Sequence, residues 1–125
     1  MDKVKILIVD DNESFLDLLK EFLCKNGYVV ACSVNGVEAQ NKFIEFKPDL
    51  VVTDIVMPDV DGIELLIGLR NINPNIRVIV MSGGNRGHAD TYLHMADALG
   101  ANAILNKPFK LSDLLAEVKK LEAVA

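Results

Sequence analysis

Five short runs of apolar residues constrain the fold of this chain more than any other feature. They occupy residues 6–9, 28–32, 50–53, 78–81 and 103–105. The first four are rich in β-branched residues and are apolar throughout, not only at alternate positions. Strands of this kind are buried on both faces, as in a parallel sheet that is covered by helices. The chain is therefore expected to fold around a parallel sheet.

Longer stretches with helical spacing follow each run. Apolar residues recur every three or four positions over residues 15–23, 37–46, 63–72, 92–99 and 111–121. Asn26-Gly27 is expected to end the first helix with a left-handed cap. Strands that alternate with helices five times are joined as parallel neighbours by right-handed crossovers. The predicted fold class is α/β: a flavodoxin-like (βα)5, doubly wound sheet of five parallel strands in the order 2-1-3-4-5.

Length and composition narrow the class of protein. The chain has 125 residues, which predicts one domain over residues 1–125 and no second domain. Its 18 acidic residues outnumber 13 basic ones, a balance that argues against direct binding of nucleic acid. The apolar run at residues 6–9 is too short for a signal peptide or a membrane span, so a cytoplasmic protein without membrane contact is expected. Cys24 and Cys32 are expected to be buried, reduced thiols.

Polar residues stand at the carboxyl ends of four predicted strands, where such sheets bind ligands. Asp10 and Asp11 follow the first run, Asp54 the third, Ser82 the fourth and Lys107 the fifth. Singly, each could serve as a helix cap, a turn residue or a surface lysine. Together they bring three carboxylates to one edge, where each pair about 5 Å apart costs roughly 3 kcal/mol at an effective dielectric constant near 20. A cation is therefore expected, and Mg²⁺ suits oxygen ligands best.

The motifs that contain these residues resemble those of the receiver domains of response regulators, the phosphorylation switches of two-component signalling. The resemblance covers essentially the whole chain and is carried by Val9-Asp10-Asp11-Asn12, by the stretch from Asp54 to Gly62, by Met81-Ser82-Gly83, and by Lys107-Pro108-Phe109.

The resemblance implies a role for each acidic residue of the site. Asp54 would accept a phosphoryl group from a phosphohistidine, carried by a sensor histidine kinase or a histidine phosphotransfer protein. Asp11 and Asp54 would bind Mg²⁺ together with the backbone carbonyl of Val56, and Asp10 would assist from close by. The domain would catalyse only its own phosphorylation and dephosphorylation, and would not turn over a substrate as an enzyme.

The resemblance also implies how the phosphoryl group is held and sensed. Ser82 would donate its hydroxyl to the phosphoryl group, and Lys107 would pair with a phosphoryl oxygen after a cis Lys107-Pro108 bond. Movement of these residues would reshape the face formed by the fourth helix, the fifth strand and the fifth helix, which would then bind an unknown downstream protein. Many receivers place an aromatic residue three positions before the lysine, but this chain has Ile104 there.

The sequence argues against three other functions. A receiver-like docking module that takes no phosphoryl group would not need the full set of acids, serine and lysine. A flavodoxin-like flavin binder would need a Ser/Thr/Gly-rich phosphate loop after the first strand, where this chain has Asp10 and Asp11. A phosphatase with an aspartate nucleophile generally has that nucleophile after the first strand, with another acid two residues on. Asn12 and Glu13 follow the pair instead.

Overall fold

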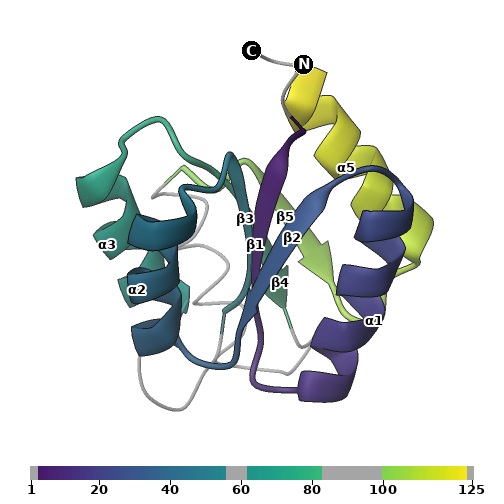
Figure 1. The fold of residues 1–125 in the computed structure, drawn as a ribbon, viewed down its shortest axis with the longest axis horizontal. Coiled ribbons are helices and arrows are strands. Elements are labelled where there is room, and N and C mark those ends of the chain that lie inside the picture. The colour runs from purple at the N-terminus through teal and green to yellow at the C-terminus, as the bar shows by residue number, and fades with distance from the viewer. Residues whose placement is uncertain (1–2, 56–61, 83–99, 124–125) are drawn as a thin grey trace.

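The computed structural model describes residues 3–55, 62–82 and 100–123, and at its centre is a five-stranded sheet (Figure 1). The strands follow the order β2-β1-β3-β4-β5, and every neighbouring pair is parallel. Their bounds are β1 Lys5–Val9, β2 Val29–Ser33, β3 Leu50–Asp54, β4 Arg77–Ser82 and β5 Ala103–Asn106. The predicted fold class and strand order are confirmed.

Helices cover both faces of the sheet. The described helices are α1 Glu13–Lys25, α2 Gly36–Phe46, α3 Gly62–Ile72 and α5 Leu111–Ala123. In Figure 1, α1 and α5 lie on one side of the sheet, and α2 and α3 lie on the other. The helix that the sequence predicts over residues 92–99 lies outside the described residues.

Two apolar clusters, one on each face, explain why consecutive residues of the central strands are apolar. In β1, Ile6 and Ile8 join the cluster with residues of α1 and α5, whereas Leu7 and Val9 join the cluster with residues of α2 and α3. The central strands β3 and β4 are buried in the same way. The edge strands are not, since Val29 of β2 is 38% exposed and no described residue of β5 is fully buried. The expectation of burial on both faces is therefore wrong for the second run.

The end of α1 has the cap that the sequence predicts. Gly27 has a φ of +95°, and the backbone N–H groups of Gly27 and Tyr28 donate to the carbonyls of Cys24 and Leu23. This is the Schellman arrangement, which a glycine favours because it has no Cβ to clash. Because the cap uses the N–H of Tyr28, β2 begins at Val29, one residue later than the apolar run.

The exposure of the two cysteines differs from the prediction, whereas location and nucleic-acid binding stay predictions. Cys24 is exposed and Cys32 is partly buried, so the prediction of two buried thiols is wrong. Cys24 lies next to Leu23, about 100° around α1 from the buried side of that helix.

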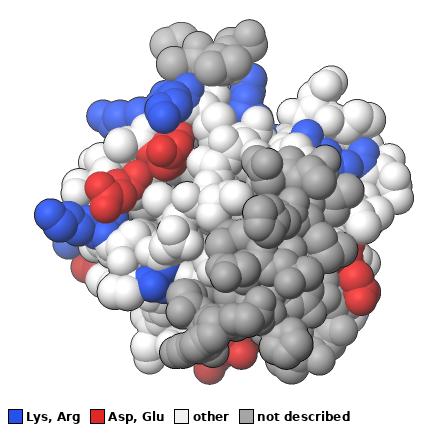
Figure 2. All heavy atoms as spheres, turned by 180° about the vertical axis from the view of Figure 1, so that it is seen from behind, with Lys and Arg blue, Asp and Glu red and all other residues white. Residues whose placement is uncertain are grey.

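Among the described residues, no helix is both long and apolar enough to cross a bilayer. Where Figure 2 shows described residues, acidic and basic side chains both occur. The predictions about location and nucleic acid stay predictions.

Candidate phosphoryl-acceptor site

The predicted acidic residues lie together at the carboxyl ends of β1 and β3. These strands are neighbours, with Val9 opposite Thr53, so the residues that follow are brought to one edge. One carboxylate oxygen from each of Asp10, Asp11 and Asp54 lies within 4.8 Å of the other two. Asp10 and Asp54 are buried, whereas Asp11 is exposed. Folding therefore places two carboxylates out of solvent and a third at the mouth of the site.

Lys107 reaches this cluster from the end of β5. Its Nζ lies 2.6 Å from Oδ2 of Asp10 and 3.6 Å from Oδ2 of Asp54. The backbone N–H of Lys107 donates to the carbonyl of Ser82, which is fully buried at the end of β4. The Lys107-Pro108 peptide bond is cis, as the resemblance implies. The structure thus brings the lysine beside two of the acids, and the serine to the end of the neighbouring strand.

Local hydrogen bonds orient the two buried carboxylates. Oδ1 of Asp10 accepts the backbone N–H of Asn12 at 2.9 Å. Asn12 caps α1 in turn, because its own Oδ1 accepts the backbone N–H of Phe15 at 3.1 Å. Oδ1 of Asp54 accepts the backbone N–H of Ile55 at 2.9 Å. The start of α1 and the end of β3 therefore hold these side chains in place.

The electrostatics of the site disfavour an ionised Asp54. Burial raises the pKa of its carboxyl, and the nearby charges of Asp10 and Asp11 add to the rise. Lys107 and the hydrogen bond from Ile55 lower the pKa, but the net shift is upward. The site therefore opposes loss of the proton from Asp54. A bound cation would offset the free-energy cost of ionising this carboxyl, which Lys107 and Ile55 offset only in part.

Replacing Asp54 by asparagine should therefore stabilise the metal-free protein. A carboxyl whose pKa is higher in the folded than in the unfolded protein contributes to stability at a pH below the unfolded-state pKa. This contribution to stability is lost as the pH rises through the folded-state pKa. At pH 7 an ionised Asp54 thus costs stability. We expect Asp54→Asn to raise the free energy of unfolding measured in urea titrations with a chelator.

An exposed aspartate on α1 provides the control for this prediction. Asp17→Asn should change the free energy of unfolding little under the same conditions. Mg²⁺ should then stabilise the parent protein more than Asp54→Asn, because the variant has lost one carboxylate ligand. An Asp54→Asn protein less stable than the parent in chelator would show that repulsion is not the dominant effect at this position.

The donor set suits a hard divalent cation. Oxygen ligands about 2.1 Å from an octahedral ion lie roughly 3–4 Å apart. The oxygens of Asp10, Asp11 and Asp54 need only small movements to reach that spacing. The remaining predicted ligand, the carbonyl of Val56, lies outside the described residues.

Two aromatic residues of the site were not predicted as functional. Lys107 Nζ lies 4.7 Å from the centroid of the Phe15 ring, and that ring meets Phe109 edge-on with centroids 6.0 Å apart. In the sequence, Phe15 belongs to the helical spacing of α1, and Phe109 to the Lys107-Pro108-Phe109 motif. The pattern of the sequence does not indicate that α1 brings a ring to the lysine, because this contact is made between distant elements.

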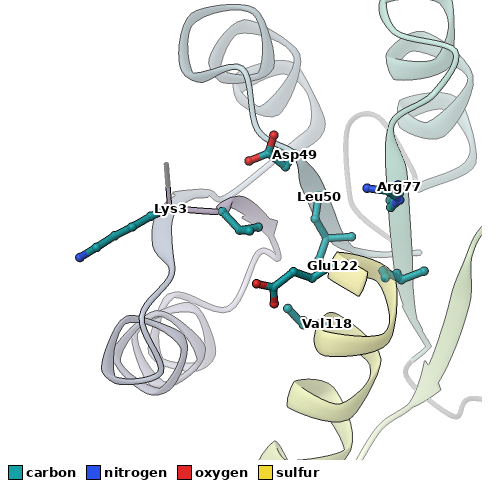
Figure 3. Close-up of a pocket in the computed structure, with 8 residues that line it drawn as sticks. Lys3, Asp49, Leu50, Arg77, Val118 and Glu122 are labelled. Carbon is teal, nitrogen blue, oxygen red and sulfur yellow. The ribbon is translucent and has the colours of Figure 1, made fainter. Parts of the chain in front are cut away.

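A hollow lies at the opposite end of the sheet and is separate from this cluster. It has a volume of about 280 Å³ and is lined in part by the first residues of β3 and β4, Leu50 and Arg77 (Figure 3). Asp49 and Glu122 also line it. The acids and lysine of the candidate site do not line this hollow, so its shape has no bearing on their chemistry.

Comparison with known proteins decides the family. A sequence model described as the response regulator receiver domain matches residues 6–119. The chain belongs to this family. The receiver is 39% identical over 116 residues to sporulation initiation phosphotransferase F of Bacillus subtilis strain 168, covering 93% of this chain and 91% of that protein.

Other relatives extend the similarity to longer proteins and to solved structures. The receiver is 36% identical over 118 residues to response regulator MprA of Mycobacterium sp. strain KMS, which covers 94% of this chain but 50% of that protein. It thus spans about half the length of several curated relatives. A receiver domain protein from Methanospirillum hungatei JF-1 superimposes with a TM-score of 0.87 at 31% identity, covering 98% of this chain and 96% of that one.

Proposed function

We propose that this receiver accepts a phosphoryl group on Asp54 from a phosphohistidine in a Mg²⁺-dependent reaction. The donor would be a sensor histidine kinase or a histidine phosphotransfer protein. The observation that carries the proposal is the packing of Asp10, Asp11 and Asp54 within 4.8 Å, with Lys107 in contact with two of them. Such a charge cluster suits phosphoryl transfer, which depends mainly on positioning and on neutralising oxygen charges.

Asp11, Asp54 and the carbonyl of Val56 are the proposed Mg²⁺ ligands, with Asp10 assisting. The ion supplies positive charge to the phosphoryl oxygens when it is bound. Asp11 is exposed and therefore lies where an ion and its waters can enter. Asp10 is held by both Asn12 and Lys107, which favours a supporting role over a primary one.

In the transfer step, a carboxylate oxygen of Asp54 forms a bond to phosphorus as the bond from phosphorus to the histidine nitrogen breaks. The electron pair of that bond stays with the leaving imidazole, which takes a proton from solvent. Lys107 would pair with one phosphoryl oxygen, and Ser82 would donate its hydroxyl to another. Both sit at strand ends beside Asp54, since β4 pairs with β3 and with β5. The protein would promote only its own phosphorylation and dephosphorylation.

The signal is proposed to leave the site through the ends of β4 and β5. Lys107 and Ser82 are joined by a backbone hydrogen bond of 2.7 Å, so a shift of one residue moves the other. Ile104 stands where many receivers have an aromatic residue. It is partly buried against the cluster beneath α2 and α3 and lacks a ring that could turn inward. Backbone movement would therefore reshape the face that includes β5 and α5, and a downstream protein would bind there; the fourth helix predicted for this face lies outside the described residues.

The intact mass of the chain after incubation with a small acyl phosphate tests this proposal. One added phosphoryl group per molecule is expected with Mg²⁺ and none with a chelator, because the crowded carboxylates then repel the donor. The chelated sample, restored with excess Mg²⁺, serves as the control for damage to the protein. Equal labelling with and without the ion would refute the role of Mg²⁺, and no labelling under either condition would refute the acceptor role.

A further inference from the structure

The ammonium group of Lys107 has an aromatic neighbour as well as two acidic ones. Its Nζ lies 4.7 Å from the centroid of the Phe15 ring, beside the contacts of 2.6 Å to Asp10 and 3.6 Å to Asp54. The Phe15 ring packs edge-on against Phe109 at an interplanar angle of 68°. Both rings also pack against the apolar cluster beneath α1 and α5. The aromatic surface beside the lysine is therefore held by the core of the protein.

The acidic and aromatic neighbours differ in what a divalent cation does to them. Carboxylate oxygens of Asp10 and Asp54 are partners of Lys107 and are also oxygens that Mg²⁺ needs. An ion bound there would weaken their attraction for the ammonium group and would repel it directly. The face of a phenyl ring attracts an ammonium group but offers no oxygen to a hard cation. Of these three side-chain contacts of Lys107, the ion thus does not compete for the one with Phe15.

We propose that Phe15 is a positioning residue that keeps the Lys107 ammonium beside Asp54 once the carboxylates have bound Mg²⁺. This inference rests on the proposed function, because it assigns Lys107 to the phosphoryl oxygens. Phe109 supports the Phe15 ring from the segment that leads from Lys107 into α5. The ring acts through the lysine and makes no contact with the phosphoryl group itself.

The first test needs no phosphoryl donor and begins without a metal ion, which is added only in its last step. Protons above the face of a phenyl ring are shielded, so the ε-methylene resonances of Lys107 should lie upfield of ordinary lysine values. Phe15→Leu should return them to ordinary values. Phe22→Leu removes a partly buried ring from α1 that packs against the same apolar cluster. The Lys107 ε-methylene resonances should stay shifted upfield in this variant. Unchanged resonances in Phe15→Leu, or loss of the shift when Mg²⁺ is added to the parent, would overturn the proposal.

The second test measures labelling by a small acyl phosphate at saturating Mg²⁺. Phe15→Leu should slow the reaction about three- to tenfold, as expected for loss of one cation–π contact, with unchanged Mg²⁺ affinity. Phe15→Tyr keeps a ring face and should restore most of the rate. Phe22→Leu should react like the parent.

A double substitution separates positioning from a general effect on packing. In a Lys107→Met background, Phe15→Leu should slow labelling no further, because the ring then has no ammonium to hold. An equal slowing in both backgrounds would overturn the proposal. A parent chain that takes up no phosphoryl group would refute the proposed function, and the NMR comparison would still decide whether Phe15 holds Lys107.

Discussion

Asp54→Ala is expected to remove all phosphoryl labelling of this receiver by a small acyl phosphate and Mg²⁺. Asp54 ends β3, is 8% exposed and has one oxygen held by the N–H of Ile55, so its carboxylate is presented in a fixed direction. The neighbouring carboxylates of Asp10 and Asp11 lie within 4.8 Å and can attract the ion, but Asp10 is already bound by Asn12 and Lys107, and Asp11 is exposed. Intact mass spectrometry should show one added group in the parent and none in the variant.

Two further proteins make the Asp54 result specific. Asp17→Ala removes an exposed aspartate from α1 and should be labelled like the parent. Asp54→Asn keeps the shape of the side chain but cannot form an acyl phosphate, so it should resemble Asp54→Ala. Persistent labelling of both Asp54 variants would place the acceptor on another residue, with Asp10 and Asp11 as the first to be examined.

Lys107→Met is expected to slow labelling by about a hundredfold, the usual cost of losing one preorganised donor from a site where oxygen charge is stabilised. Methionine has about the length of lysine but no charge. The substitution also leaves the buried carboxylate of Asp10 without the ammonium that lies 2.6 Å from it. We therefore expect a lower free energy of unfolding in chelator, and a larger stabilisation by Mg²⁺ than the parent shows.

Lys110→Met is the matched control for this prediction. Lys110 is exposed and lies three residues beyond Lys107, ahead of α5, so its loss should change neither the labelling rate nor the response to Mg²⁺. Labelling rates should be followed by mass at saturating donor and Mg²⁺, with folding checked by circular dichroism. Lys107→Met and parent proteins that react equally fast would exclude Lys107 from the phosphoryl-binding site.

The sheet and the location of the site were accessible from sequence because both depend on local patterns. Parallel strands buried on both faces need consecutive apolar residues, and the middle residues of β1, β3 and β4 have them. Once the strand order follows from the alternation with helices, residues at strand ends meet at one edge. That is why Asp10, Asp54 and Lys107 could be grouped before any distance was known.

The tertiary structure decided which of those residues are buried and which atoms are in contact. Only packing buries Asp10 and Asp54 while leaving Asp11 exposed, and only packing sets Lys107 closer to Asp10 than to Asp54. The ring of Phe15 reaches the lysine because α1 lies against the sheet beside the segment that follows β5, 92 positions later in the chain. Such contacts depend on how the helices pack against the sheet. The local periodicity that predicts a strand or a helix carries no information about distances between side chains so far apart in the sequence.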